Sequence, residues 1–190
     1  MDLLIDKEFR VRNEKNIDLL FSYIKPFLNH GSIILTSVFH HTSSLISPSP
    51  IKHSSFCYIE NNNYFILEIS TGKKLSKIDI KDFLKNVDCI FIFKYHDKNI
   101  MNKTMDYVFD YKDLNYGFFG NTEYCFKLIF DVYRDVYKNH YGILYKRISD
   151  FFPVFSIFGL EFVNSNSILK SKKFLPTCCV LNNIFIEFKN

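Results

Sequence analysis

Tryptophan is absent from this sequence of 190 residues, and glycine (6) and proline (5) are scarce. No apolar stretch is long enough to span a bilayer. The longest, residues 151–163, is interrupted by Pro153 and falls short of the ~20 residues that a membrane helix needs. The charged N-terminal segment, residues 1–15, lacks the apolar core of a signal peptide. These absences predict a soluble, cytoplasmic protein without a transmembrane segment.

Long runs of basic residues are missing as well, and residues 170–173 are typical of the short pieces that occur. The net charge of +4 is mild and is spread along the chain. A surface that binds nucleic acid needs clustered Lys and Arg. We therefore expect no nucleic-acid partner.

The cysteines show no regular spacing. Their number is odd, which argues against a disulfide framework, and the adjacent pair has no second pair at the spacing of a zinc site. We expect neither a metal nor a cofactor, and a reducing compartment. The five positions are Cys57, Cys89, Cys125, Cys178 and Cys179.

The residues that are abundant indicate a well-packed globular protein. Hydrophobic residues make up 47% of the chain and aromatic residues 18%, with 22 phenylalanines. The length fits one domain. We predict a single domain over residues 1–190, with a helical extension at 1–28 and a core from about residue 29 onward.

Hydrophobic periodicity predicts an α+β fold, a mainly antiparallel sheet with a cysteine-bearing helix packed on it. Residues 1–12 suit a short strand or an arm, and residues 40–50 suit a polar loop. Cys57 and Cys89 fall inside expected strands and are read as packed residues. The expected elements are helices at 16–28, 99–111 and 125–139, strands at 32–38, 54–60, 64–70, 87–95 and 179–188, and a strand end with a short helix at 77–84.

Residues 116–138 stand out because a loop with two glycines leads into an amphipathic helix. Asn121 or Thr122 can cap this helix, and Glu123 suits its positive end. Cys125 then lies in the first turn, where the helix N-terminus stabilises a thiolate. The competing interpretation is a small core residue, because free cysteine is often buried. The apolar face comprises Cys125, Leu128, Ile129, Val132 and Val136.

A reactive cysteine needs a base, and His53 lies where the polar loop enters the first strand of the expected hairpin. Glu68 lies in the second strand among apolar residues, where a carboxylate is costly to bury without a partner. If the turn leaves an even number of residues unpaired, Glu68 pairs with Ser55 or Cys57 and shares a face with His53. An odd number places the two on opposite faces. An exposed loop histidine and a water-facing carboxylate are the alternatives.

Several short segments occur in a characteristic order and spacing: GSII at 31–34, Lys52-His53, FILEISTG at 65–72, YGF at 116–118 and YCFKL at 124–128. Together they resemble the permuted NlpC/P60-like cysteine hydrolases, and in particular their poxvirus members. These enzymes have a circularly permuted papain-like fold. A departure from the family pattern is Ser54-Ser55, which stands where relatives have a small or apolar residue and a glycine after the histidine. His40 and His41 remain rivals for the base.

The resemblance implies that Cys125 is the nucleophile, that His53 is the general base and acid, and that Glu68 orients the imidazole. Backbone N–H groups near Tyr124 and Cys125 then stabilise the oxyanion. Tyr116 or Tyr124 is expected to add a hydroxyl that contacts the substrate.

The activity implied is that of a hydrolase or acyltransferase that cleaves an amide, ester or thioester through a thioester acyl-enzyme. The substrate stays open among acyl, peptide and lipid-linked molecules, and so does peripheral contact with a membrane. The alternative is an inactive viral interaction module that keeps the papain-like fold. The viral resemblance implies the host cytoplasm.

Overall fold

The computed structural model describes residues 14–37, 51, 53–70, 72–87, 89–117, 122–141, 155–157, 160–163, 165–181 and 184–188. Within them, seven strands form one sheet in the order β11-β10-β5-β1-β2-β3-β4, and each neighbouring pair is antiparallel. The strands are β1 (Ile33–Ser37), β2 (His53–Glu60), β3 (Asn63–Glu68), β4 (Ser76–Asp79), β5 (Cys89–Tyr95), β10 (Phe174–Leu181) and β11 (Ile184–Glu187).

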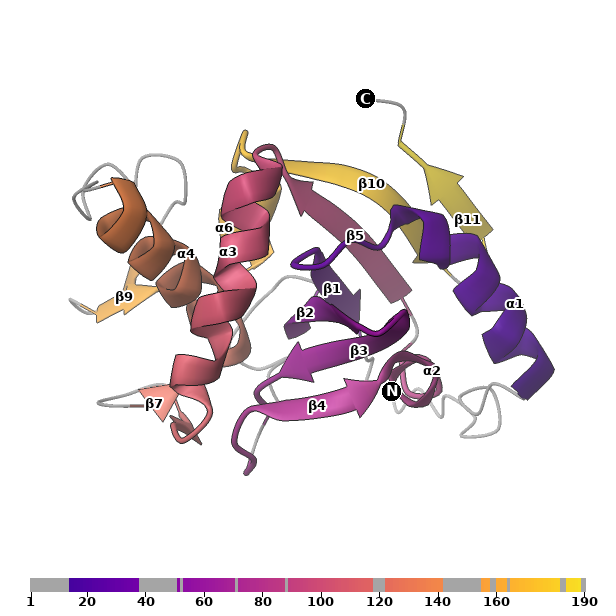
Figure 1. The fold of residues 1–190 in the computed structure, drawn as a ribbon, viewed down its shortest axis with the longest axis horizontal. Coiled ribbons are helices and arrows are strands. Elements are labelled where there is room, and N and C mark those ends of the chain that lie inside the picture. Colours follow the sequence, from indigo (N-terminus) through magenta and orange to yellow (C-terminus); the bar gives the residue numbers. More distant parts are fainter. Residues whose placement is uncertain are drawn as a thin grey trace, which may run out of the picture.

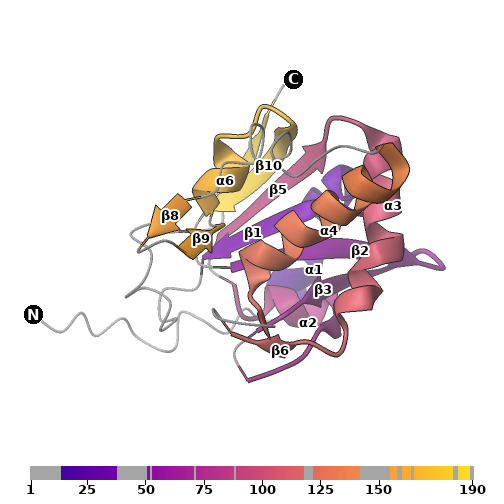
Figure 2. The ribbon, with the colours of Figure 1, turned by 90° about the vertical axis from the view of Figure 1, so that its left-hand side faces the viewer.

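Helices cover both faces of this sheet (Figures 1 and 2). On one face lie α3 (Lys98–Val108) and α4 (Cys125–Tyr141), and on the other lie α1 (Glu14–Ile24) and α2 (Ile80–Leu84). None of the helices in the described ranges is long and apolar enough to cross a membrane. The shorter elements are η2 (Lys25–Phe27), η4 (Phe109–Tyr111), β6 (Asn115–Tyr116), β7 (Thr122–Glu123), β8 (Phe155–Ile157), β9 (Leu160–Phe162) and α6 (Ser165–Leu169).

The central strand β1 supplies both cores, because successive side chains of a strand point to opposite faces. Ile33 and Leu35 pack in the cluster with α3 and α4, whereas Ile34 packs in the cluster with α1 and α2. All five residues of β1 are buried. The sequence 32–38 therefore reads as a continuous apolar run rather than an alternating one.

The β2–β3 hairpin, which the sequence predicts, is confirmed. Asn61 and Asn62 have φ angles of 50° and 64°, and asparagine tolerates this left-handed region. The turn leaves these two residues between the paired residues Glu60 and Asn63. The ladder reaches Phe56 opposite Leu67, and continuing it by one step places Glu68 across from Ser55.

The approach to β1 requires a glycine. Gly31 has φ +86°, and its N–H donates to the Cys57 carbonyl at 2.8 Å. A Cβ at this position would lie 2.4 Å from the carbonyl oxygen of Met101 in α3. The absence of a side chain thus lets α3 approach the start of the sheet.

The other predicted elements within the described ranges are also confirmed, with two corrections. The single strand expected at 179–188 is wrong, because β10 and β11 form an antiparallel pair. The expected capping by Thr122 and the place of Glu123 in the helix are wrong too, because both residues form β7, parallel to β6. Tyr124 precedes α4, and its carbonyl accepts from Leu128 N–H at 2.9 Å.

Several predictions fall on residues outside the described ranges: the arm at 1–12, the loop at 40–50, and Asn121. The division of the domain near residue 28 also stays a prediction. Within the described ranges α1 is part of the packed structure, because Ile17, Leu20 and Ile24 are buried against the sheet.

Candidate active site

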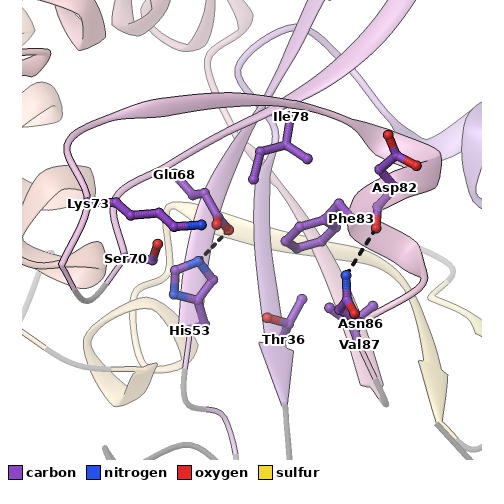
Figure 3. Close-up of a pocket in the computed structure, with 10 residues that line it drawn as sticks. All are labelled: Thr36, His53, Glu68, Ser70, Lys73, Ile78, Asp82, Phe83, Asn86 and Val87. Atoms are coloured by element: carbon purple, nitrogen blue, oxygen red, sulfur yellow. Dashed lines mark hydrogen bonds and ion pairs between the residues drawn. The ribbon is translucent and has the colours of Figure 1, made fainter. Parts of the chain in front are cut away.

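His53 and Glu68 meet at one end of the β2–β3 hairpin. His53 is the first residue of β2 and Glu68 the last of β3, and His53 Nε2 lies 2.7 Å from Glu68 Oε2 (Figure 3). Their side chains are only 13% and 12% exposed. Since an ionised carboxylate only accepts, Nε2–H is the donor. The other ring nitrogen, Nδ1, is then left for a second partner.

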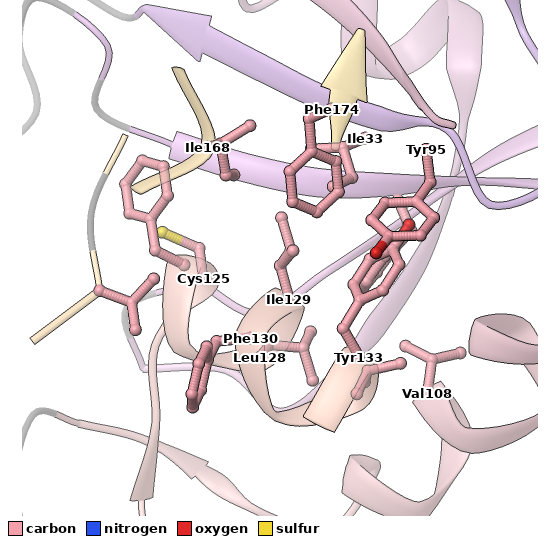
Figure 4. Close-up of a cluster of buried hydrophobic side chains, with 14 of the residues drawn as sticks. Ile33, Tyr95, Val108, Cys125, Leu128, Ile129, Phe130, Tyr133, Ile168 and Phe174 are labelled. Carbon is pink, nitrogen blue, oxygen red and sulfur yellow. The ribbon is translucent and has the colours of Figure 1, made fainter. Parts of the chain in front are cut away.

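Cys125 lies close enough to His53 for each side chain to shift the pKa of the other. It is the first residue of α4 and 5% exposed, and its sulfur lies at the edge of the cluster between α4 and the sheet (Figure 4). The N-terminal end of α4 carries a partial positive charge, which favours a thiolate.

The electrostatics of the pair favour a thiolate and an imidazolium. Burial acts to lower the pKa of His53. The charge of Cys125, and then the hydrogen bond and charge of Glu68, outweigh it and raise that pKa to about 10. Burial acts to raise the pKa of Cys125. The charge of His53, followed by the backbone N–H and the hydroxyl of Ser54, outweighs it and lowers that pKa.

Ser54 is a contributor that the sequence did not identify. Its backbone N–H and its hydroxyl both act to lower the pKa of the Cys125 thiol, although the buried hydroxyl does not reach hydrogen-bonding geometry with any described group. It pairs with Leu35 of β1, whose side chain packs in the α3/α4 cluster, so Ser54 shares that face. The available signal was alternation along β2, because the residue after the base points toward the opposite face.

The two tyrosines expected to contact substrate make contacts within the protein core. Tyr124 is 4% exposed, and its hydroxyl accepts from Val163 N–H at 2.8 Å, which ties the segment after β9 to the start of α4. Tyr116 is half-buried in β6 and packs against the α3/α4 cluster. Their contact with substrate stays a prediction.

The remaining described histidines lie elsewhere. His30 Nδ1 accepts from Ile59 N–H at 3.0 Å, and His140 Nε2 lies 3.1 Å from the Tyr107 hydroxyl. The pKa of His96 is lowered by burial and by the charge of Lys173. The rivals at positions 40 and 41 are outside the described ranges.

The other cysteines are packed in strands. Cys57 and Cys89 are buried, as the sequence predicts. Burial raises the pKa of Cys57 to about 12, and burial with the charges of Cys179 and Glu187 does the same for Cys178. The pKa of Cys179 is also raised by burial. The lowered pKa of Cys125 therefore contrasts with three thiols that are held protonated.

A pocket of about 340 Å³ opens beside the His53–Glu68 pair on the side of α2 (Figure 3). Ser70 and Lys73 line it near the pair, and Phe83 of α2 lines its apolar wall. Among the residues that the structure describes, no group of three or more His, Cys, Asp or Glu side chains is arranged to hold a metal ion.

A family model of the permuted papain-like amidase enzymes YaeF/YiiX, the C92 family, matches residues 27–175, which is more than half of the chain. This chain belongs to the C92 family. C92 membership makes it a relative of permuted papain-like amidases.

Poxvirus proteins are among the similar sequences. Protein OPG091 of vaccinia virus (strain Copenhagen) is 24% identical over 115 residues, which are 60% of this chain and 70% of the viral protein. Protein OPG091 of variola virus (isolate Human/India/Ind3/1967) gives the same identity and coverage. The resemblance to a permuted papain-like family with poxvirus members is thus confirmed.

The crystal structure of the metalloprotein YiiX from Escherichia coli O157:H7 has a similar fold. The TM-score is 0.57 at 12% identity, and the match covers 79% of this C92 chain and 96% of YiiX. At this identity the likeness shows the fold, a permuted papain-like arrangement of antiparallel sheet and helices. The narrower NlpC/P60 assignment stays a prediction.

Proposed function

We propose that this C92 protein is a cysteine hydrolase that cleaves an amide bond, with Cys125 as the nucleophile, His53 as the acid and base, and Glu68 as the orienting residue. The observation that carries the proposal is the convergence of the three side chains. The imidazole holds Glu68 at 2.7 Å through Nε2 and lies close enough to Cys125 for the two groups to shift each other's pKa. Membership of an amidase family agrees with it.

In the first half of the reaction, the Cys125 thiolate attacks the carbonyl carbon of the amide. A C–S bond forms, and the π electrons of the carbonyl move to its oxygen. The imidazolium then donates its proton to the leaving nitrogen as the C–N bond breaks. The amine departs, and a thioester joins the acyl group to Cys125.

In the second half, neutral His53 takes a proton from a water molecule, whose oxygen attacks the thioester carbonyl. The C–S bond breaks, the carboxylic acid leaves, and the thiolate–imidazolium pair is restored. An alcohol or amine in place of water would give acyl transfer by the same proton path. Esters and thioesters are open to the same attack.

The surrounding groups have distinct roles in this scheme. Glu68 accepts from Nε2–H and so keeps Nδ1 facing the sulfur. The first N–H groups of α4 have no partner within the helix, so they suit the oxyanion. Loss of one such donor typically costs ~3 kcal/mol of transition-state stabilisation.

The test is the rate at which iodoacetamide alkylates each cysteine as a function of pH, with the modified residue located by mass spectrometry. We expect rapid, selective labelling of Cys125 well below the usual thiol pKa of ~8.5. In His53→Ala this low-pH labelling should disappear, because the charge that lowers the pKa is gone. In Glu68→Gln it should weaken less, because the imidazole remains.

Slow labelling of Cys125 with the same pH dependence in the parent protein and in His53→Ala would contradict the proposal. Circular dichroism of each variant shows whether the fold is retained. The interaction-module alternative would then be taken up again, together with the histidines at positions 40 and 41.

A further inference from the structure

The pocket beside the candidate active site has the dimensions of a small-ligand site. Its volume of about 340 Å³ lies at the lower end of the ~300–1,000 Å³ typical of such sites. His53 and Glu68 line it, whereas Cys125 does not. A molecule held at the thiol would therefore reach this pocket with a part other than its reacting carbonyl.

Lys73 supplies a positive charge at the end of the pocket that is nearest the pair. Its side chain extends toward Glu68 (Figure 3), yet its ammonium makes no hydrogen bond or ion pair within the described part of the chain. The neighbouring Lys74 differs, because it pairs with Asp113 at 3.6 Å and does not line the pocket. Of these two adjacent lysines, only Lys73 is therefore placed to bind a ligand in the pocket.

The acidic groups around the pocket already have partners. Glu68 is held by His53 at 2.7 Å. Asp82 lies on the opposite side of the pocket (Figure 3) and is bound by Lys85 at 2.7 Å. Lys73 is exposed to solvent, and among the described residues that line the pocket it carries the charge without a partner. An anionic group of a ligand would balance this charge.

The rest of the lining is mixed. Ser70, beside Lys73, offers a hydroxyl that can donate to the same anion. Ile78, Phe83 and Val87 supply apolar contacts on the other side (Figure 3). A short aliphatic chain that ends in an anionic group would match both the apolar side and the polar side of the pocket.

We propose that this pocket binds a carboxylate on a short aliphatic part of the substrate, with Lys73 as the residue that selects the anion. The carboxylate is separate from the carbonyl attacked by Cys125. This inference rests on the proposed function, because it takes the pocket to be the subsite next to the reacting thiol. It narrows the substrates to amides that carry a second, anionic group.

The test compares two probes of the same chain length, hexanoate and hexan-1-ol, in binding titrations followed by the NMR shifts of the Ile78 and Val87 methyl groups. We expect hexanoate to bind about tenfold more tightly than hexan-1-ol, because a charge-assisted hydrogen bond is lost with the neutral probe. In Lys73→Met this preference should disappear. In Lys74→Met, the matched control, it should persist.

Equal affinity of the two probes for the parent protein would overturn the inference. A preference for hexanoate that survives in Lys73→Met would overturn the role of Lys73 and point to the imidazolium as the anion's partner. Neither probe contains a bond that the proposed reaction cleaves, so the titration reports on the pocket of the parent protein whether or not Cys125 is reactive. A preference for hexanoate that depends on Lys73, found together with an unreactive Cys125, would therefore refute the proposed function and leave the anion site standing.

Discussion

At the scale of single residues, His53 lies between two groups that act on its pKa in the same direction. Glu68 accepts the Nε2 proton, and the charge of Cys125 acts on the same ring. Each neighbour favours the protonated ring, which is why the pKa of a buried histidine is raised here rather than lowered. Cys125, His53 and Glu68 together therefore determine whether the proton stays on the sulfur or on the imidazole.

Ser54 offers a residue-scale prediction with a matched control. Ser54→Ala removes a buried hydroxyl that acts to lower the pKa of Cys125 without reaching hydrogen-bonding geometry. The pH at which alkylation of Cys125 by iodoacetamide is half-maximal should therefore rise, but by less than the one to two units that loss of a full hydrogen bond to a charged group (~1.5–3 kcal/mol) would give.

Ser55→Ala is the control for that measurement. Ser55 is equally buried but alternates to the other face of β2, and it makes no contribution to the pKa of Cys125. Its labelling profile should match that of the parent protein. An unchanged profile in Ser54→Ala would show that the serine hydroxyl does not act on the thiolate.

The residue scale also shows the limit of sequence reasoning. The pairing of His53 with Glu68 was predicted only for an even number of unpaired turn residues, because three successive asparagines left the turn length open; the structure has a two-residue turn, which fixes the register. The contact of Ser54 with Cys125 was not, because it depends on where α4 lies over β2. Periodicity gives the face of a helix but not its position along a distant strand.

At the scale of elements, the junction between β1 and α3 depends on Gly31. Gly31→Ala should destabilise the protein by more than about 2 kcal/mol, because the new Cβ would lie 2.4 Å from the Met101 carbonyl and the backbone is left-handed. Urea unfolding measures the change in the free energy of unfolding.

Gly72→Ala separates the two causes. Gly72 also has a positive φ, +75°, but nothing lies within 4 Å of its added Cβ. Only the backbone strain of about 1–2 kcal/mol should appear there. A loss at Gly31 no larger than at Gly72 would mean that α3 moves aside without cost.

Elements far apart in the chain were the hardest to predict. The strand over 89–95 is evident from its apolar run, but its neighbours β1 and β10 come from residues 33–37 and 174–181. The pairing of β6 with β7 likewise overrode the expected helix cap at Thr122. Local propensity carries no information about such partners, so a cap and a strand end look alike in sequence.

At the scale of the whole molecule, the shifted pKa values predict how stability depends on pH. The unfolded chain has a neutral thiol and a neutral imidazole between about pH 6.5 and pH 8.5, and so holds one proton on this pair. The folded pair, as thiolate and imidazolium, also holds one. The pair therefore adds no slope to the free energy of unfolding in this interval.

Outside the interval the two states differ. Below about pH 6.5 the unfolded histidine binds a second proton, so the stability from the pair falls as the pH falls. Above about pH 8.5 the unfolded thiol loses its proton while folded His53 keeps one until about pH 10, so stability falls as the pH rises.

Cys125→Ala makes the prediction measurable by urea unfolding at several pH values. Without the thiol, burial lowers the pKa of His53 against the smaller raising effect of Glu68. Above about pH 8.5 the parent should lose stability by up to ~1.4 kcal/mol per pH unit, because only its unfolded thiol gives up a proton, whereas the variant, which has no thiol there, should show no such decline. Parallel curves for the two proteins would mean that the thiol and imidazole do not share a proton.

The sheet order has a consequence for the sequence of events during synthesis. Five adjacent strands, β5-β1-β2-β3-β4, all come from residues 33–95 and emerge from the ribosome before α4. His53 and Glu68 can therefore be paired in the sheet before Cys125 has been synthesised. The thiol acquires its altered acidity only when its helix docks, so the nascent chain carries no activated sulfur until the last layer closes.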